Sequence, residues 1–183
     1  HPAAASAWYF IASNYEQKAA QYKPYGDSTY QYEKVKAREI CERVLQQKTE
    51  SEGRTDCQNI LNSLLFRNLN FQMERANIPG QPIRVLMQYA NVPLINLRIV
   101  RLDERLKEEL NKAKSIWTPL AKARPEKQWE QILPLPNDLH SHTTEIKLDA
   151  LPAGEYWLLA STDKDFTQST AILVGRSFYV TSI

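Results

Sequence analysis

The fold is decided by the stretch Leu-Asp-Ala-Leu-Pro-Ala-Gly-Glu-Tyr-Trp-Leu-Leu-Ala-Ser-Thr, residues 148–162. Its Leu151, Gly154 and Tyr156 have the spacing L-x-x-G-x-Y, in which the hydroxyl of a tyrosine early in a strand bonds back to the preceding turn. We expect Gly154 to supply the backbone freedom that such a corner needs. From Tyr156 to Ala160, apolar side chains point to both faces, which is typical of a strand covered on both sides.

Outward from this stretch, apolar residues occupy every second position in most of the chain after residue 68, and this period of two predicts strands. Leu69, Phe71 and Met73 begin the pattern. It recurs around residues 83–89, 95–99, 129–132, 144–148 and 171–183. In the segment around 95–99, Asn96 and Arg98 are expected to face outward. About seven strands at this turn spacing indicate an antiparallel β-sandwich.

One helix is expected to interrupt the strands near residues 103–115. Leu102, Leu106, Leu110 and Ala113 recur there at helical spacing among charged residues, so we expect an amphipathic helix on the flank of the sandwich. Its adjacent Glu108 and Glu109 face different directions and do not form a carboxylate pair.

Residues 1–67 predict three amphipathic helices, because apolar residues recur there at helical spacing. The stripes are Trp8, Ile11, Ala12, Tyr15, Ala19 and Tyr22; then Lys34, Ala37, Ile40, Cys41, Val44 and Leu45; and last Cys57, Ile60, Leu61, Leu64 and Leu65. Asp27 or Ser28 is expected to cap the second helix, and Thr55 or Asp56 the third. Gly53 marks the stop between them. The predicted class is α+β, with a helical unit at 1–67 and a sandwich at 68–183.

Composition excludes several classes of partner. The 183 residues carry 23 Lys and Arg against 21 Asp and Glu, a net charge of +2, which gives no reason to expect nucleic acid as a partner. No apolar run reaches the ~20 residues of a membrane span, so no direct membrane insertion is expected. Because the sequence opens with His1 and Pro2, we interpret it as a fragment whose ends do not report targeting.

Cys41 and Cys57 lack the spacing of a metal site. We expect free buried thiols. The alternative is a disulfide bond, which would require antiparallel packing of the second and third helices in an oxidising compartment.

Metal-type ligands gather in the stretch Asp138-Leu139-His140-Ser141-His142. On a strand His140 and His142 would share one side and could seat a zinc ion with further ligands; alternatively, they lie in a loop leading to a strand and bond to backbone. No G-x-S-x-G elbow surrounds a serine, and five glycines form no phosphate-binding loop. We therefore predict that the protein is not an enzyme and that it has no catalytic residues, no cofactor and no metal site.

Four tyrosines, Tyr22, Tyr25, Tyr30 and Tyr32, lie close together in the sequence. They could stack on a sugar or a peptide, as in a binding module of a nutrient-uptake complex. Alternatively, they fill gaps between helices with their hydroxyls in water.

Four passages in fixed order resemble the α2-macroglobulin family of Bacteroidetes-type bacteria. They are residues 55–61, residues 89–92 with 97–102, residues 129–134 with 137–142, and residues 151–161 with 178–182. The resemblance implies a macroglobulin-like domain (related in architecture to fibronectin type III) within a large protease inhibitor that traps its target. It also implies a periplasmic or cell-surface location, with neighbouring domains of the same polypeptide and a target protease as partners.

Neither functional site of that family can be carried onto this sequence. Its thioester needs Cys-Gly-Glu-Gln, whereas Cys41 precedes Glu-Arg-Val and Cys57 precedes Gln-Asn-Ile. A long bait segment is also missing. The resemblance therefore implies a non-catalytic framework module.

Overall fold

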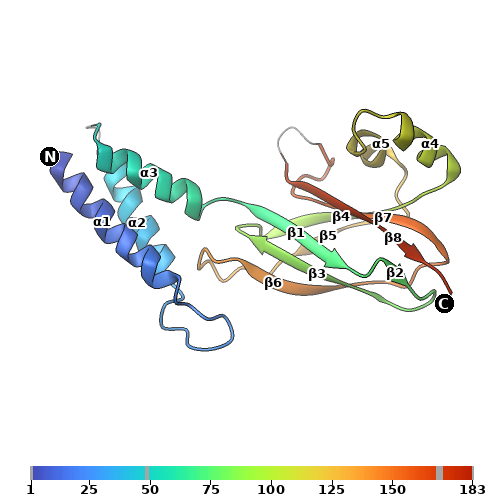
Figure 1. Ribbon diagram of the computed structural model, residues 1–183, viewed down its shortest axis with the longest axis horizontal. Coiled ribbons are helices and arrows are strands. Elements are labelled where there is room, and N and C mark those ends of the chain that lie inside the picture. The colour runs from blue at the N-terminus through green and yellow to red at the C-terminus, as the bar shows by residue number, and fades with distance from the viewer. Residues whose placement is uncertain (1, 48–49, 168–170, 183) are drawn as a thin grey trace. The chain divides into compact units, whose positions relative to one another are not determined.

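The computed structural model describes residues 2–47, 50–167 and 171–182, which form five helices and eight strands (Figure 1). The predicted α+β class is confirmed. The chain divides into two units. A helical unit comprises His1–Arg67 with Leu135–Ser141, and a β unit comprises Asn68–Pro134 with His142–Ile183. None of the described helices is long and apolar enough to cross a membrane.

The helical unit contains α1 (Pro2–Ala19), α2 (Glu33–Leu45) and α3 (Glu52–Leu64), packed pairwise against one another. Its core consists mostly of small and aliphatic side chains. The predicted starts of α2 and α3 are wrong. Asp27 and Ser28 lie outside α2, which begins at Glu33 after a turn at residues 29–32, and α3 is capped by Ser51, whose side chain accepts a hydrogen bond from the Arg54 amide.

Gly53 lies inside α3, so its predicted role as a helix stop is also wrong. A Cβ atom at Gly53 would lie 2.3 Å from the Ser6 nitrogen and 2.5 Å from the Ala5 carbonyl carbon. The first turn of α3 therefore packs directly on the backbone of α1. Glycine is required there because no side chain fits between the two helices.

The segment Leu135–Ser141 packs with the helices, although the predicted boundary placed it with the strands. The side-chain amide of Gln31 donates to an Asp138 carboxylate oxygen at 3.1 Å, and Lys34 Nζ donates to the Leu139 carbonyl at 3.2 Å. Leu139 also packs against the helical core. A remote segment of sequence thus completes the helical unit.

The β unit contains two sheets. The strands are β1 (Asn68–Met73), β2 (Ala76–Asn77), β3 (Ile83–Ala90), β4 (Leu94–Arg101), β5 (Lys127–Ile132), β6 (His142–Leu148), β7 (Gly154–Ser161) and β8 (Leu173–Val180). One sheet has the order β1-β3-β6 and the other β2-β8-β7-β4-β5.

The prediction of seven antiparallel strands is wrong in two respects, the number of strands and the direction of one pairing. The additional strand, β2, has only two residues and pairs in parallel with β8; the other pairings are antiparallel. Two residues are too few to produce a periodic signal.

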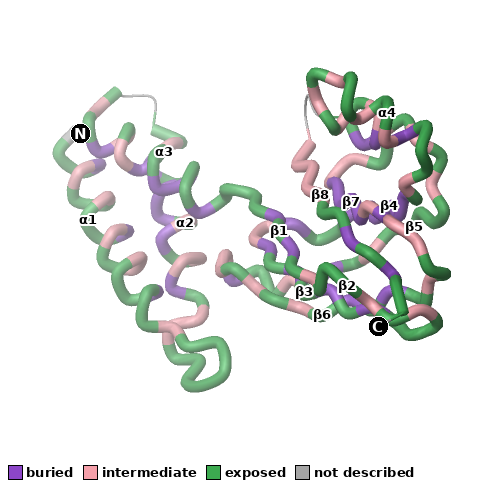
Figure 2. The backbone as a smooth tube through the Cα atoms, turned by 45° about the vertical axis from the view of Figure 1, so that its right-hand side comes forward, coloured by how far each residue is buried: buried purple, intermediate pink, exposed green. Residues whose placement is uncertain are grey.

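The outer face of the five-stranded sheet is covered by α4 (Glu104–Lys112) and α5 (Trp117–Lys122). Leu106 of α4 and Leu120 of α5 form a core with Val100, Leu159 and Phe166. The helix expected near 103–115 is therefore present, whereas α5 was not predicted. Buried positions consequently follow one another along β4 and β7 in Figure 2, instead of alternating.

Tyr156 forms the predicted corner, because its hydroxyl donates to the Pro152 carbonyl at 3.0 Å. The predicted reason for Gly154 is wrong, since Gly80 is the positive-φ glycine among the described residues. A Cβ at Gly154 would lie 3.3 Å from the Tyr156 hydroxyl oxygen and 3.3 Å from Arg101 Nε. Gly154 therefore provides space for its neighbours.

Candidate functional site

The two histidines of the predicted zinc alternative lie in different units. His140 belongs to the segment that completes the helical unit, where its ring centroid is 4.7 Å from that of Tyr22. His142 begins β6, and its ring is 6.1 Å from that of Tyr89. His140 precedes the strand, so the two do not share a strand face. In the part of the chain that the structure describes, no three His, Cys, Asp or Glu side chains gather to hold a metal ion.

The two cysteines come together in the core of the helical unit. Cys41 of α2 and Cys57 of α3 are both unbridged and fully buried, and each thiol is near enough to influence the pKa of the other. Burial raises the pKa of both thiols. Because the thiolate is the reactive form, neither cysteine is prepared for nucleophilic catalysis in the folded unit.

The four tyrosines have unequal surroundings. Tyr22 is partly buried and packs on His140, and Tyr30 is also partly buried. Tyr25 is 96% exposed and Tyr32 is 51% exposed. The two exposed rings belong to the connection between α1 and α2, so they are the members of this group that a ligand could reach.

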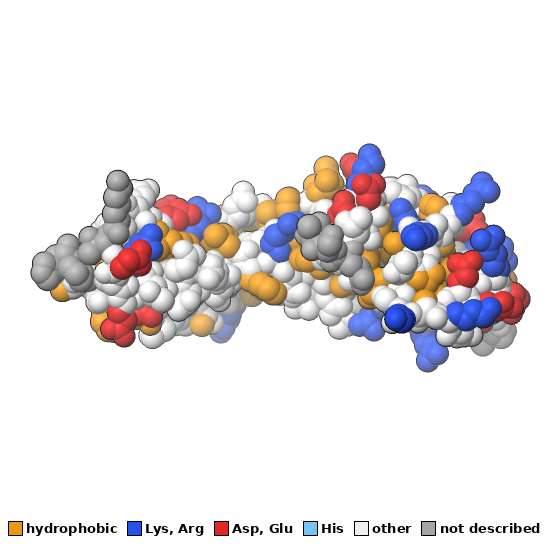
Figure 3. Space-filling model, turned by 90° about the horizontal axis from the view of Figure 1, so that it is seen from above, with side chains coloured by type: hydrophobic (Ala, Val, Ile, Leu, Met, Phe, Trp, Pro, Cys, Tyr) orange, Lys and Arg blue, Asp and Glu red, His pale blue; other side chains and the backbone are white. Residues whose placement is uncertain are grey.

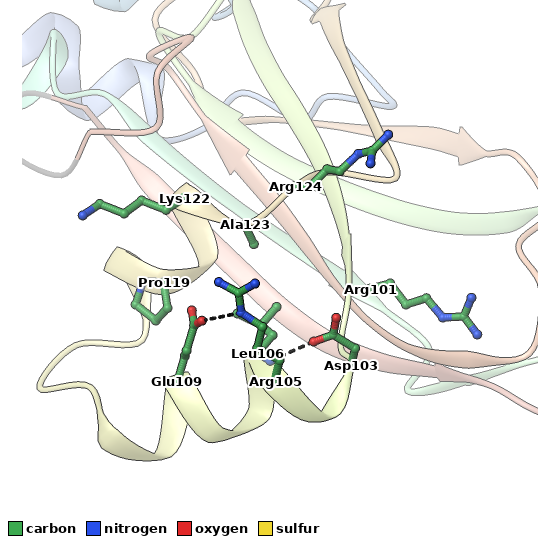
Figure 4. Close-up of a pocket in the computed structure, with 9 residues that line it drawn as sticks. All are labelled: Arg101, Asp103, Arg105, Leu106, Glu109, Pro119, Lys122, Ala123 and Arg124. Carbon is green, nitrogen blue, oxygen red and sulfur yellow. Dashed lines mark hydrogen bonds and ion pairs between the residues drawn. The ribbon is translucent and has the colours of Figure 1, made fainter.

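A hollow of about 490 Å³ lies beside α4 and α5 (Figure 4). It is lined by Arg101, Asp103, Arg105, Leu106, Glu109, Pro119, Lys122, Ala123 and Arg124. This volume is large enough for a small ligand. Four of its lining side chains are basic and two are acidic.

Three of the charged groups in this hollow form contacts within α4 or at its start, and the others point away from one another. Asp103 caps α4 by accepting from the Leu106 amide at 2.8 Å, and Arg105 pairs with Glu109 at 3.0 Å. Arg101, Lys122 and Arg124 point in three different directions in Figure 4. Polar groups that bind a ligand converge on it, and these do not converge.

Glu108 and Glu109 form separate ion pairs on the surface of α4. Glu108 pairs with Lys112, whereas Glu109 pairs with Arg105, so the prediction that they face different directions is confirmed. On the face of the β unit shown in Figure 3, basic and acidic side chains are interspersed.

Arg98 is a buried cation that the sequence analysis placed on an outer face. It lies in β4, where Nε donates to the Gln128 side chain at 3.0 Å and a terminal nitrogen donates to the Ala121 carbonyl. Its guanidinium carbon is 4.1 Å from the Phe166 ring centroid. Burial lowers the pKa of Arg98. The side chain connects the sheet to the end of α5, so its role is structural.

Asn96 is buried as well, so the expectation that Asn96 and Arg98 lie on an open outer face is wrong, because the outer face at Arg98 is covered by α5. Their position among the apolar residues of β4 was the available signal. It was missed because the covering helix α5 had not been predicted.

No protein-family model matches the chain, and no curated protein matches it. Among solved structures, it is similar to a CARDB domain from Pyrococcus furiosus, determined in complex with di-metal ions. The identity is 11%, the TM-score is 0.34, and the match covers 63% of this chain and 90% of that chain. A β-glucosidase from Listeria innocua, in complex with gluconolactone, matches with 9% identity and a TM-score of 0.33, covering 63% of this chain and 17% of that one. At these TM-scores the likeness carries no functional argument.

Proposed function

We propose that this chain is a non-catalytic framework module of a large α2-macroglobulin-like protease inhibitor. The observation that carries the proposal is that the buried charged side chains, Glu33, Arg98 and Asp138, are engaged in structural contacts. Glu33 pairs with Lys36 inside α2, Arg98 holds the end of α5, and Asp138 anchors the segment Leu135–Ser141 to Gln31, just before α2. An active site directs such groups toward a substrate, whereas each of these is engaged within the helical unit or the β unit.

A five-stranded sheet with both faces covered is suited to hold neighbouring domains at fixed angles. In a trap of this kind, cleavage elsewhere in the polypeptide becomes a rigid-body rearrangement of packed domains. The partners of this module would be neighbouring domains of the same polypeptide, with the target protease engaged by the full-length protein. Its place would be the periplasm or the cell surface.

The experiment compares the full-length protein with a version that lacks this segment. Each is mixed with an active protease, and cleavage of a large protein substrate is measured beside cleavage of a short peptide. A trap excludes the large substrate while the peptide still reaches the active site. We expect protection from cleavage of the large substrate only when the segment is present. Equal protection without it would contradict the proposal.

A second candidate is a glycan- or peptide-binding module of a surface nutrient-uptake complex. The observation that favours it is the exposure of Tyr25 and Tyr32, because exposed aromatic rings can stack on a sugar or a peptide side chain. A glycan array probed with the chain and with Tyr25→Ala tests it. Specific hits that disappear in the variant would support this candidate, and the absence of hits for the parent chain would eliminate it.

A further inference from the structure

Cys41 and Cys57 face each other across the hairpin formed by α2 and α3. Cys41 lies about one turn before α2 ends at Leu45, and Cys57 lies little more than one turn after α3 begins at Glu52. The two are therefore level with each other where the helices pack together. Both are fully buried in the same core, where each thiol is near enough to influence the pKa of the other.

We propose that Cys41 and Cys57 are joined by a disulfide bond in the working protein, introduced by a thiol–disulfide oxidoreductase while the helical unit is still open. One cysteine thiolate attacks the disulfide of the oxidant and forms a mixed disulfide, releasing one thiolate of the oxidant. The second cysteine thiolate then attacks the mixed disulfide and releases the other. The two cysteines lose two protons and two electrons in total, and the oxidant is reduced to a dithiol.

The burial of the pair determines when the bond can form. In the folded unit neither residue is accessible, so an oxidant cannot reach them. Burial also raises the pKa of both thiols and keeps the attacking thiolate scarce. Oxidation therefore precedes closure of α2 on α3, and the completed bond is afterwards protected from reductants by the same burial.

The composition of the core explains what the bond contributes. Three of the ten buried residues in the helical core are alanine, Ala5, Ala12 and Ala37, and small side chains bury little apolar area. Small units with limited cores are commonly stabilised by disulfides, which restrict the unfolded chain. A bond between Cys41 and Cys57 would join α2 to α3 about one turn from the connection between the two helices. The oxidising compartment that such a bond requires is the location given with the proposed function, so the inference rests on that proposal in this one respect.

The test determines the state of the cysteines in the chain produced in an oxidising compartment. The protein is denatured, treated with a maleimide without reductant, and digested for mass spectrometry. We expect the peptides that contain Cys41 and Cys57 to be linked to each other and to react with maleimide only after reduction. Full labelling of both cysteines before reduction would overturn the proposal. In the matched control, Cys41→Ser, Cys57 should be labelled at once.

A second measurement tests the order of events. The reduced chain is exposed to glutathione disulfide, either folded or in urea, and intramolecular bond formation is followed over time. We expect bond formation at least tenfold faster in urea. Equal rates in the two conditions would show that the folded pair is accessible and would overturn the proposed timing.

Discussion

The cores of the helical unit and the β unit differ in the size of their side chains. Glycine and alanine let the helices approach closely, and the backbone of α1 lies directly against Gly53. The largest fully buried side chains of the β unit are aromatic, among them Phe71, Tyr89, Tyr156 and Phe178. Stacked sheets lie about 10 Å apart and require large side chains between them. The helical unit should therefore be most sensitive to added volume, and the β unit to removed volume.

The largest effect is expected from removal of volume in the β unit. Phe178→Ala should lower the free energy of unfolding by about 3–5 kcal/mol, because it leaves a cavity where a fully buried ring stacked on Tyr156. Urea denaturation monitored by tryptophan fluorescence measures the loss. The exposed Ile132, replaced by alanine, is the control, and it should change stability by less than about 0.5 kcal/mol. Similar losses in the two variants would contradict the comparison.

Addition of volume to the helical unit should have the next largest effect. Gly53→Ala places a methyl group against the α1 backbone, and relief of this overlap should cost about 2–3 kcal/mol even though alanine favours helices. Hydrogen exchange in α1 and α3 reports the local loss. Gly26→Ala is the matched control, because its methyl group would find its nearest neighbour at 3.4 Å. A stabilised Gly53→Ala variant would show that the two helices do not pack closely.

A smaller effect is expected at the tyrosine corner. Tyr156→Phe removes the hydroxyl that bonds the Pro152 carbonyl and should cost about 1 kcal/mol. The thermal unfolding midpoint of the β unit measures it. Tyr179→Phe, on a more exposed residue of β8, should leave the midpoint nearly unchanged. If both variants behave alike, the corner contributes nothing measurable.

The smallest effect concerns the pH dependence of the reduced helical unit. The pKa values of Cys41 and Cys57 are raised from 9.0 in the folded state, mainly by burial. Above about pH 9 the unfolded chain therefore releases thiol protons that the folded chain retains, so stability falls as pH rises. Hydrogen exchange in α2 and α3, corrected for the intrinsic rate at about pH 8 and about pH 10, should show this fall. In a Cys41→Ala/Cys57→Ala variant, stability should fall less between these two pH values than in the parent chain. An equal loss of stability in the variant would show that other groups cause it.

The contrast between the units also explains what the sequence could reveal. Apolar periods of 3.6 and two identified both units, the helix α4 and most strands, because these signals are local. The burial of Arg98 could not be anticipated in this way. It depends on α5, a separate helix that begins only at Trp117. The role of Gly53 depends on Ala5 and Ser6, which lie far away in the sequence.

The candidate site shows the same limit. The sequence identified His140, His142 and the tyrosines as side chains capable of chemistry, but their surroundings are set by the segment Leu135–Ser141, which packs with the helices. Asp138 forms its contact with Gln31 across more than half of the sequence. No local sequence pattern encodes such a contact. Only the structure could therefore show whether these side chains are available for binding or have structural roles.

The central claim is that this chain acts by holding a shape, and one variant of the full-length protein tests it most directly. Trp117→Ala removes a ring that packs on Gly175, Leu159 and Trp157, and so loosens α5 on the sheet without touching the charged hollow's arginines. The measurement is the ratio of large-substrate to peptide cleavage by the bound protease, with Lys112→Ala as the exposed control. We predict that this ratio rises for Trp117→Ala and stays unchanged for the control. An unchanged ratio in a Trp117→Ala protein whose β unit exchanges hydrogen faster would contradict the account.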